Sequence, residues 1–380
     1  MFRNIFQKKN TKSKYYDITE LNEQNATYNY ILSERSAGKS YQMKKLVIDK
    51  NLESGECFFL LRRYAEDIAN YLTESYFGDM YHYIKEASEG RFNSVVVENK
   101  CFYLCFLDED GKKNDLQRLG YIRSLSQSGR YKSTTYSDVT SIVFEEFIDE
   151  KARYLPNEID AYTSVLSTVA RDSRLRVYMI GNMLDRTCPY FYHHQLVDVP
   201  KQKAGTIAIY KHSTGDYNRD TGEEIFVTIA VEIPPDTTSK KTNEMFVGNT
   251  RKNVTKGGSW SESEQPTIKL KDNHIKIYTV FFEREYLKFI ADFYIDSISG
   301  DCFWWVSSKE TPIRLTSNMR LISDRIYNNP MCTNSLTPLS NREGKMFEYF
   351  RHNKVYYSTN LTGTEFKRCL TWFRSATYLT

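Results

Sequence analysis

Residues 30–47, YILSERSAGKSYQMKKLV, carry most of a phosphate-binding loop. The pattern G-x-x-x-x-G-K-[ST] surrounds phosphates with backbone N–H groups, its lysine reaches the β- and γ-phosphates, and its hydroxyl ligates Mg²⁺. Gly38, Lys39 and Ser40 match the end of the pattern, whereas Ser33 replaces its first glycine. A small serine can make the same turn if φ is not strongly positive. The predicted ATP-binding residues are Ser33, Arg35, Ser36, Ala37, Gly38, Lys39 and Ser40.

Two adjacent glutamates, Glu145 and Glu146, end a second apolar run, SIVFEEF. The run predicts a buried strand, at whose end Glu145 would hold Mg²⁺ and Glu146 would polarise the attacking water. An aspartate is usual at the first position, so the longer Glu145 leaves the metal geometry open. We expect Lys39 and Glu146 to meet across one triphosphate at the tips of adjacent strands. The alternative is an acidic strand end that faces solvent.

Four further polar residues are candidates for catalysis. Asn182 follows the apolar run VYMIG, and we expect it to reach the γ-phosphate from a neighbouring strand. Arg35, inside the loop, would place a cation beside the γ-phosphate or Glu146. Arg171 follows a predicted helix on the side away from its own loop, so in a ring it would serve a neighbour's site as an arginine finger, and Lys132 would do the same. The alternative for Arg171 and Lys132 is a solvated surface charge.

The elements around these residues alternate between strands and helices. A β-rich run precedes the loop, and apolar residues at helical spacing follow it, which is the context that the motif requires. Such alternation predicts an α/β fold with a mostly parallel sheet flanked by helices. The expected strands are 28–32, 57–63, 140–147 and 175–182, with a hairpin over 94–107 and a helix over 156–171.

Composition limits the class of protein. A chain of 380 residues is long enough for two domains, and its net charge of +4 does not by itself indicate a nucleic-acid binder. The seven cysteines include no C-x-x-C pair, which fits free thiols in a reducing compartment. The sequence has neither an apolar run long enough for a bilayer nor a signal-peptide core at its start. We therefore expect a soluble intracellular protein without a membrane partner.

The composition changes along the chain. Residues 1–25 are polar and basic and predict a loose N-terminal arm. A polar, weakly patterned stretch with five basic and two acidic residues between 236 and 256 predicts a basic linker. The predicted division is an arm over 1–25, an ATPase domain over 26–235, the linker over 236–262 and a smaller α+β domain over 263–380.

Several stretches together resemble one family, the DNA-packaging ATPases of the small φ29-like tailed phages (Picovirinae). The resemblance rests on AGKSYQMK, LRRY, SIVFEEFIDE, YLPNEIDAYTSVLSTVARDSRLR, NMLDRTCPYF and VDVP. It covers residues 25–235 well and continues more weakly to the C-terminus. It implies a P-loop ASCE (RecA-like) fold related to terminase large subunits, with ATP and Mg²⁺ as cofactors.

The resemblance also assigns roles and partners. It implies that Arg171 and Lys132 act across subunit interfaces in a ring of five, which drives double-stranded DNA into a procapsid at the portal vertex in the host cytoplasm. It leaves open whether a packaging RNA takes part. It further implies an RNase H-like C-terminal domain, in which Asp292, Asp296 and Asp301 have turn-like or surface spacing and predict no nuclease site.

Two other functions remain open from the residues alone. The first is a terminase large subunit that also cleaves DNA, which would need clustered carboxylates and metal ions after about residue 260. The second is a non-catalytic assembly protein on a P-loop scaffold, which Ser33 and Glu145 favour because both depart from the usual motifs. ATP hydrolysis by the wild type and by Lys39→Ala separates the second from the others.

Overall fold

The computed structural model divides the chain into two compact units, Met1–Ser261 and Glu262–Thr380. The described residues are 2–7, 16–34, 37–69, 75–131, 134–149, 154–155, 157–170, 175–184, 186, 188–196, 198–218, 221–235, 265–284, 287–308, 315–316, 318–325 and 328–376. The predicted linker, 236–262, lies outside them. Each unit is described by itself.

The described strands of the first unit form one ten-stranded sheet in the order β1-β9-β10-β2-β8-β7-β3-β6-β5-β4. The six strands from β10 to β6 are parallel, and the flanking pairs are antiparallel. The strands are β1 Phe2–Gln7, β2 Tyr28–Leu32, β3 Cys57–Arg62, β4 Ser94–Glu98, β5 Cys101–Leu107, β6 Lys113–Ser124, β7 Val139–Glu145, β8 Arg176–Gly181, β9 Thr206–Tyr217 and β10 Glu224–Ile233.

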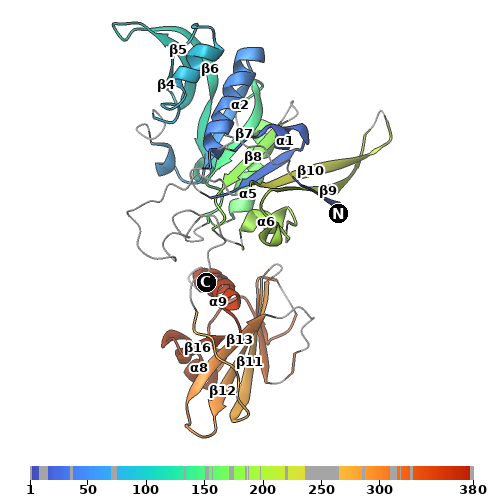
Figure 1. Ribbon diagram of the computed structural model, residues 1–380. Helices are drawn as coiled ribbons and strands as arrows, with labels where there is room; N and C mark the ends of the chain where they lie inside the picture. Colours follow the sequence, from blue (N-terminus) through green and yellow to red (C-terminus); the bar gives the residue numbers. More distant parts are fainter. Residues whose placement is uncertain are drawn as a thin grey trace. The chain divides into compact units, whose positions relative to one another are not determined.

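Helices cover both faces of this sheet (Figure 1). Side chains alternate between the faces along each buried strand, so Tyr30 and Leu32 pack with α5 and α6, whereas Ile31 packs with α2. The first unit is therefore a three-layer α/β fold. Its helices are α1 Thr19–Glu23, α2 Lys39–Ser54, α4 Tyr81–Ala87, α5 Glu158–Val169 and α6 Pro189–His193, with 3₁₀ turns η1 Glu66–Ile68, η2 Leu125–Arg130 and η3 Val199–Lys201.

The position of β8 between β2 and β7 places one strand between the phosphate loop and the two glutamates. This order agrees with the ASCE fold that we expected. It corrects one detail, because Lys39 and Glu146 follow strands that are not neighbours in the sheet.

The N-terminal segment differs from the predicted loose arm in its described parts. Phe2–Gln7 is an edge strand that pairs antiparallel with β9, and Thr19–Glu23 is a helix. Tyr16 lies against the phosphate loop, since its backbone N–H donates to the Ala37 carbonyl oxygen at 3.0 Å. These parts therefore belong to the first unit. The polar composition of the segment gave no indication of this.

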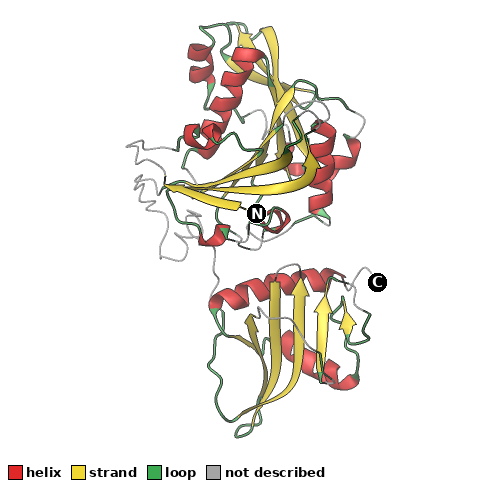
Figure 2. Ribbon diagram, turned by 90° about the vertical axis from the view of Figure 1, so that its right-hand side faces the viewer, coloured by secondary structure: helices red, strands yellow, loops and turns green. Residues whose placement is uncertain are grey.

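The second unit is a six-stranded sheet with α8 and α9 packed on a shared apolar core (Figure 2). The described strands have the order β15-β14-β11-β12-β13-β16, and among them β12 runs antiparallel to the other five. This arrangement agrees with the expected RNase H-like fold. Its elements are β11 His274–Arg284, β12 Leu287–Asp296, β13 Cys302–Ser308, β14 Met319–Ser323, β15 Cys332–Thr333, β16 Val355–Tyr357, α8 Asn341–Arg351 and α9 Asn360–Ala376.

None of the described helices combines the length and the apolar character that crossing a lipid bilayer requires.

Candidate nucleotide-binding site

The phosphate loop joins β2 to α2 at the C-terminal edge of the parallel strands. Gly38 has φ +95°, a left-handed conformation that suits glycine, and α2 begins at the next residue. The N-cap residue Gly38 makes no side-chain hydrogen bond to the helix, and the N-terminus of a helix favours anions such as phosphate. Lys39 is buried at this helix N-terminus, as a phosphate-binding lysine requires.

The Lys39 ammonium group is surrounded by oxygen atoms. Its Nζ donates to the Ser33 Oγ at 2.9 Å, the Glu34 carbonyl oxygen at 2.8 Å and the Asn182 Oδ1 at 3.0 Å. Ser33, the residue that departs from the motif, thus contributes a hydroxyl that glycine lacks. Asn182 follows β8, so the structure brings together the loop and the tip of the neighbouring strand, as the sequence predicted.

The two glutamates at the end of β7 have different environments. The buried Glu145 carboxylate accepts from the Tyr76 hydroxyl at 3.0 Å and lies 3.4 Å from the Arg62 guanidinium. Glu146 has a side chain that is 70% exposed, and its Oε2 lies 2.7 Å from Nη2 of the same arginine. Arg62 therefore holds both carboxylates. Burial, and next the charge of Glu145, raise the pKa of Tyr76 well above its usual value, which keeps this hydroxyl a donor.

The sequence analysis gave Arg62 and Tyr76 no role. Arg62 ends β3, and only the neighbouring position of β3 and β7 in the sheet places it beside the glutamates. The stretch LRRY contributed to the family resemblance, but nothing in its spacing shows which strand adjoins it.

Glu146, the first residue after β7, has φ +55°, in the left-handed region that non-glycine residues seldom adopt. Its N–H donates to the Ile180 carbonyl oxygen at 2.8 Å, which fixes the turn on β8. Gly181 makes this approach possible, because a Cβ there would lie 2.9 Å from the Phe147 ring. The turn therefore raises the Glu146 carboxylate out of the sheet toward solvent.

Four predicted residues lie outside the described residues: Arg35, Ser36, Lys132 and Arg171. Their roles remain predictions. Arg171 comes directly after Ala170, the C-cap of α5, and Lys132 directly after Tyr131, the C-cap of η2. Because α5 and η2 pack against each other, the two predicted interface residues follow elements that are in contact.

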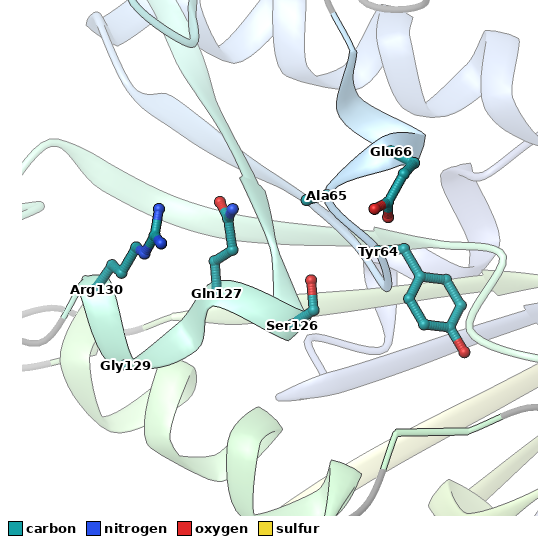
Figure 3. A pocket seen from close by; sticks show the side chains of 7 residues that line it. All are labelled: Tyr64, Ala65, Glu66, Ser126, Gln127, Gly129 and Arg130. Atoms are coloured by element: carbon teal, nitrogen blue, oxygen red, sulfur yellow. The ribbon is translucent and has the colours of Figure 1, made fainter.

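A cavity of about 500 Å³ lies at the ends of β3 and β6, between the segment after β3 and η2. In Figure 3, Glu66 extends from one side and Ser126 and Gln127 from the other. None of the described phosphate-loop residues lines the cavity, and β7 and β8 separate β3 from β2 in the sheet. It is therefore distinct from the candidate nucleotide site. Its lining residues are Tyr64, Ala65, Glu66, Ser126, Gln127, Gly129 and Arg130.

The residues present fit ATP and Mg²⁺. Lys39 supplies a buried cation at the N-terminus of α2, where the backbone N–H groups and the helix dipole favour phosphate oxygens. Ser40 in the first turn of α2 and Glu145 at the end of β7 supply the hydroxyl and carboxylate oxygens that Mg²⁺ prefers. The described residues contain no group of three or more His, Cys, Asp or Glu side chains that could hold a metal by themselves.

Acidic residues of the second unit are engaged in turns and ion pairs. Asp296 accepts from the backbone N–H of Ile298 at 2.8 Å, and Asp292 accepts from the Thr279 hydroxyl. The sequence analysis missed Glu283, a buried acid near the end of β11, whose Oε1 lies 3.3 Å from the Lys288 Nζ. These three carboxylates thus contact hydrogen-bond donors or, in the case of Glu283, a lysine ammonium group.

The fold and the site together match the P-loop ASCE fold class, with a phosphate loop and a pair of acids at one edge of a mostly parallel sheet. A family model described as Podovirus DNA encapsidation protein (Gp16) matches residues 10–218. The chain therefore belongs to the podovirus DNA encapsidation protein family.

Individual relatives agree with this family. The chain is 33% identical over 195 residues to a DNA packaging protein of Bacillus phage phi29, covering 50% of this chain and 53% of that protein. It is 30% identical over 271 residues to a DNA packaging protein of Bacillus phage B103, covering 65% and 78%. The match thus spans about half the length of the phi29 relative.

A solved structure shares the fold. It is titled the bacteriophage Phi-29 viral genome packaging motor assembly, with a TM-score of 0.53 and 20% identity, and the match covers 94% of this chain and 100% of that one.

Proposed function

We propose that this protein is an ATPase that drives double-stranded viral DNA into a procapsid. The observation that carries the proposal is the hydrogen bond of 3.0 Å between Lys39 and Asn182, on the same sheet edge as Glu145 and Glu146. A phosphate-binding lysine, a polar strand tip and a pair of acids are the parts that ATP hydrolysis requires. Membership of the DNA encapsidation family supports DNA as the cargo.

The residues of the site divide the reaction between them. Lys39 and the loop from Ser33 to Ser40 bind the phosphates, and Ser40 and Glu145 hold Mg²⁺. Bound Mg²⁺ neutralises negative charge on the β- and γ-phosphate oxygens. Glu146 orients the attacking water, for which its carboxylate must leave Arg62, now 2.7 Å away. Asn182, whose side-chain oxygen accepts a hydrogen bond from Lys39, responds to the γ-phosphate.

Further residues complete the site between subunits. Arg35 places a second cation at the loop, and Arg171 and Lys132 reach the γ-phosphate of a neighbouring subunit in a ring of five. The order of elements supports this assignment, because Arg171 and Lys132 follow α5 and η2, which pack together in the same unit. A cation from the next subunit makes hydrolysis depend on ring assembly.

The partners follow from the family. The ring assembles on the procapsid portal in the host cytoplasm and contacts DNA phosphates without reading sequence. A packaging assay tests this function: procapsids, full chain, ATP and labelled DNA are mixed, and DNA protected from added nuclease is measured. Wild type should protect DNA only with ATP, and Lys39→Ala should protect none. Protection without ATP hydrolysis would support the non-catalytic assembly protein instead.

We further propose that the second unit does not cleave DNA. The described acids there, such as Glu283 and Asp296, contact cations and N–H groups within the unit. A nicking assay on supercoiled DNA with Mg²⁺ or Mn²⁺ and the full chain tests this proposal, with Glu283→Gln as the matched variant. Metal-dependent nicking that is lost in Glu283→Gln would favour a terminase that cuts DNA.

A further inference from the structure

A buried arginine, Arg63, lies directly behind the catalytic glutamate that we propose. Its side chain is 4% exposed, and its Nε lies 3.0 Å from both carboxylate oxygens of Glu158, the first residue of α5. Burial, the largest single influence, lowers the pKa of this guanidinium, but the charge and hydrogen bonds of Glu158 together with Tyr190 and Tyr154 raise it by more, so the pKa of Arg63 is raised. Arg63 is therefore a fixed cation in the interior of the first unit.

The other two nitrogens of Arg63 bind the turn that carries Glu146. Nη1 donates to the Glu146 carbonyl oxygen at 3.1 Å, and Nη2 donates to the Phe147 carbonyl oxygen. These carbonyl groups belong to Glu146, the residue with φ +55°, and to the residue after it. A left-handed non-glycine residue costs about 1–3 kcal/mol and persists only when its surroundings hold it. Two donors from one rigid guanidinium supply that support.

The partner of Arg63 is itself held in place. The Glu158 carboxylate accepts from the Tyr190 hydroxyl at 2.7 Å and from the Leu155 N–H. The carbonyl oxygen of Arg63 accepts from the Ser126 N–H at 3.0 Å, which connects the same residue to η2. One side chain thus joins the end of β3, the turn after β7 and the start of α5.

We propose that Arg63 is a positioning residue for Glu146. It acts through the backbone of the turn, and its described hydrogen bonds involve neither the phosphate loop nor Asn182. Its loss should therefore misplace the carboxylate that orients water while leaving the phosphate-binding residues intact. This inference rests on the proposed ATPase function, and it adds a residue that touches no reacting atom.

The choice of variant separates positioning from folding. In Arg63→Lys the ammonium group keeps a positive charge beside Glu158, but it lacks the planar fork that reaches Glu158 and two carbonyl oxygens at once. The matched control is Arg320→Lys in the second unit, because Arg320 is also fully buried and lies 2.9 Å from a glutamate, Glu343. Both variants replace a buried arginine by lysine, but only Arg63 lies behind Glu146.

The experiment measures ATP turnover, the Kd of a fluorescent ATP analogue and thermal unfolding for the full chain with DNA. A misplaced catalytic group costs up to about 100-fold, so Arg63→Lys should lower kcat by about 10- to 100-fold. Its Kd for the analogue should stay within about threefold of wild type, since uniform binding is retained. Arg320→Lys should lower the Tm without lowering kcat per folded chain.

Other outcomes overturn the inference. If Arg63→Lys keeps kcat within about threefold of wild type while its Tm falls, Arg63 only stabilises the fold. If Kd and kcat are lost together, Arg63 supports the whole nucleotide site and not Glu146. If Arg63→Lys does not fold, Glu158→Gln, which keeps the side-chain volume, takes its place with the same two criteria. A wild type without ATP turnover would instead contradict the proposed function.

Discussion

Replacing His194 by glutamine should make the first unit less sensitive to acid. His194 is buried, with 8% exposure. Its Nδ1 lies 2.6 Å from the Tyr30 hydroxyl on β2, and its ring is 4.4 Å from that of Tyr28. Burial, and next the positive potential of His193 and His212, lower its pKa from 6.5 to about 3.

The sign of the effect follows from this lowered pKa. In the unfolded chain His194 takes up a proton below about pH 6.5, whereas in the folded chain it stays neutral down to about pH 3. The unfolded state therefore binds more protons over this window, and stability falls as the pH falls. At about 1.4 kcal/mol per pH unit, the loss from this one residue between pH 7 and pH 4.5 is about 2.5 kcal/mol.

Urea unfolding at pH 7 and pH 4.5 measures this loss. Wild type should lose about 2.5 kcal/mol more than His194→Gln, because glutamine does not titrate in this range. The control is His82→Gln, which makes the same substitution at a side chain that is 87% exposed on α4. Equal losses in wild type and His194→Gln would refute the reasoning, as would an NMR titration in which His194 gains a proton near pH 6.5.

Three other predictions concern the site and the cargo. Arg171→Ala should lower ATP turnover by about 10³-fold or more, and a loss below about tenfold with ring assembly intact would contradict the finger role. Arg62→Gln should free the Glu146 carboxylate and raise basal ATP turnover by up to about fivefold, because the exposed ion pair between the two side chains is worth no more than about 1 kcal/mol. A fall in turnover of more than about tenfold would show that Arg62 assists hydrolysis. The logarithm of the DNA-binding constant should fall linearly with the logarithm of the salt concentration, and the constant should not depend on DNA sequence. A binding constant that does not change with salt would argue against phosphate contacts.

Local motifs predicted where three candidate site residues lie in the fold. Lys39, Glu145 and Asn182 each stand at the end of a strand or the start of a helix, where a short stretch of sequence shows both the element and the side chain. The three-layer α/β fold followed from the same alternation of elements. The predicted strand over 140–147 is two residues too long at its end, because Glu146 adopts φ +55° and leaves the sheet.

Strand order could not be predicted from these patterns, and it decides which residues meet. The insertion of β8 between β2 and β7, and the contact of β3 with β7, place Arg62 and Arg63 at the glutamates. Both arginines are far from Glu146 in sequence, so periodicity carries no signal for the contacts. The same holds for His194, whose partner Tyr30 lies on β2. Long-range pairing of this kind is visible only in the folded chain.

We propose that Glu146 activates water beside the phosphates that Lys39 binds, and a comparison of ATP binding with ATP hydrolysis isolates this role. ATP binding and hydrolysis are measured side by side for wild type, Glu146→Gln and the control Glu89→Gln, which is also exposed and left-handed with φ +52°. The account predicts that Glu146→Gln binds ATP within about threefold of wild type and hydrolyses it about 10²- to 10⁴-fold more slowly, while Glu89→Gln is unchanged. Hydrolysis by Glu146→Gln at the wild-type rate would contradict it.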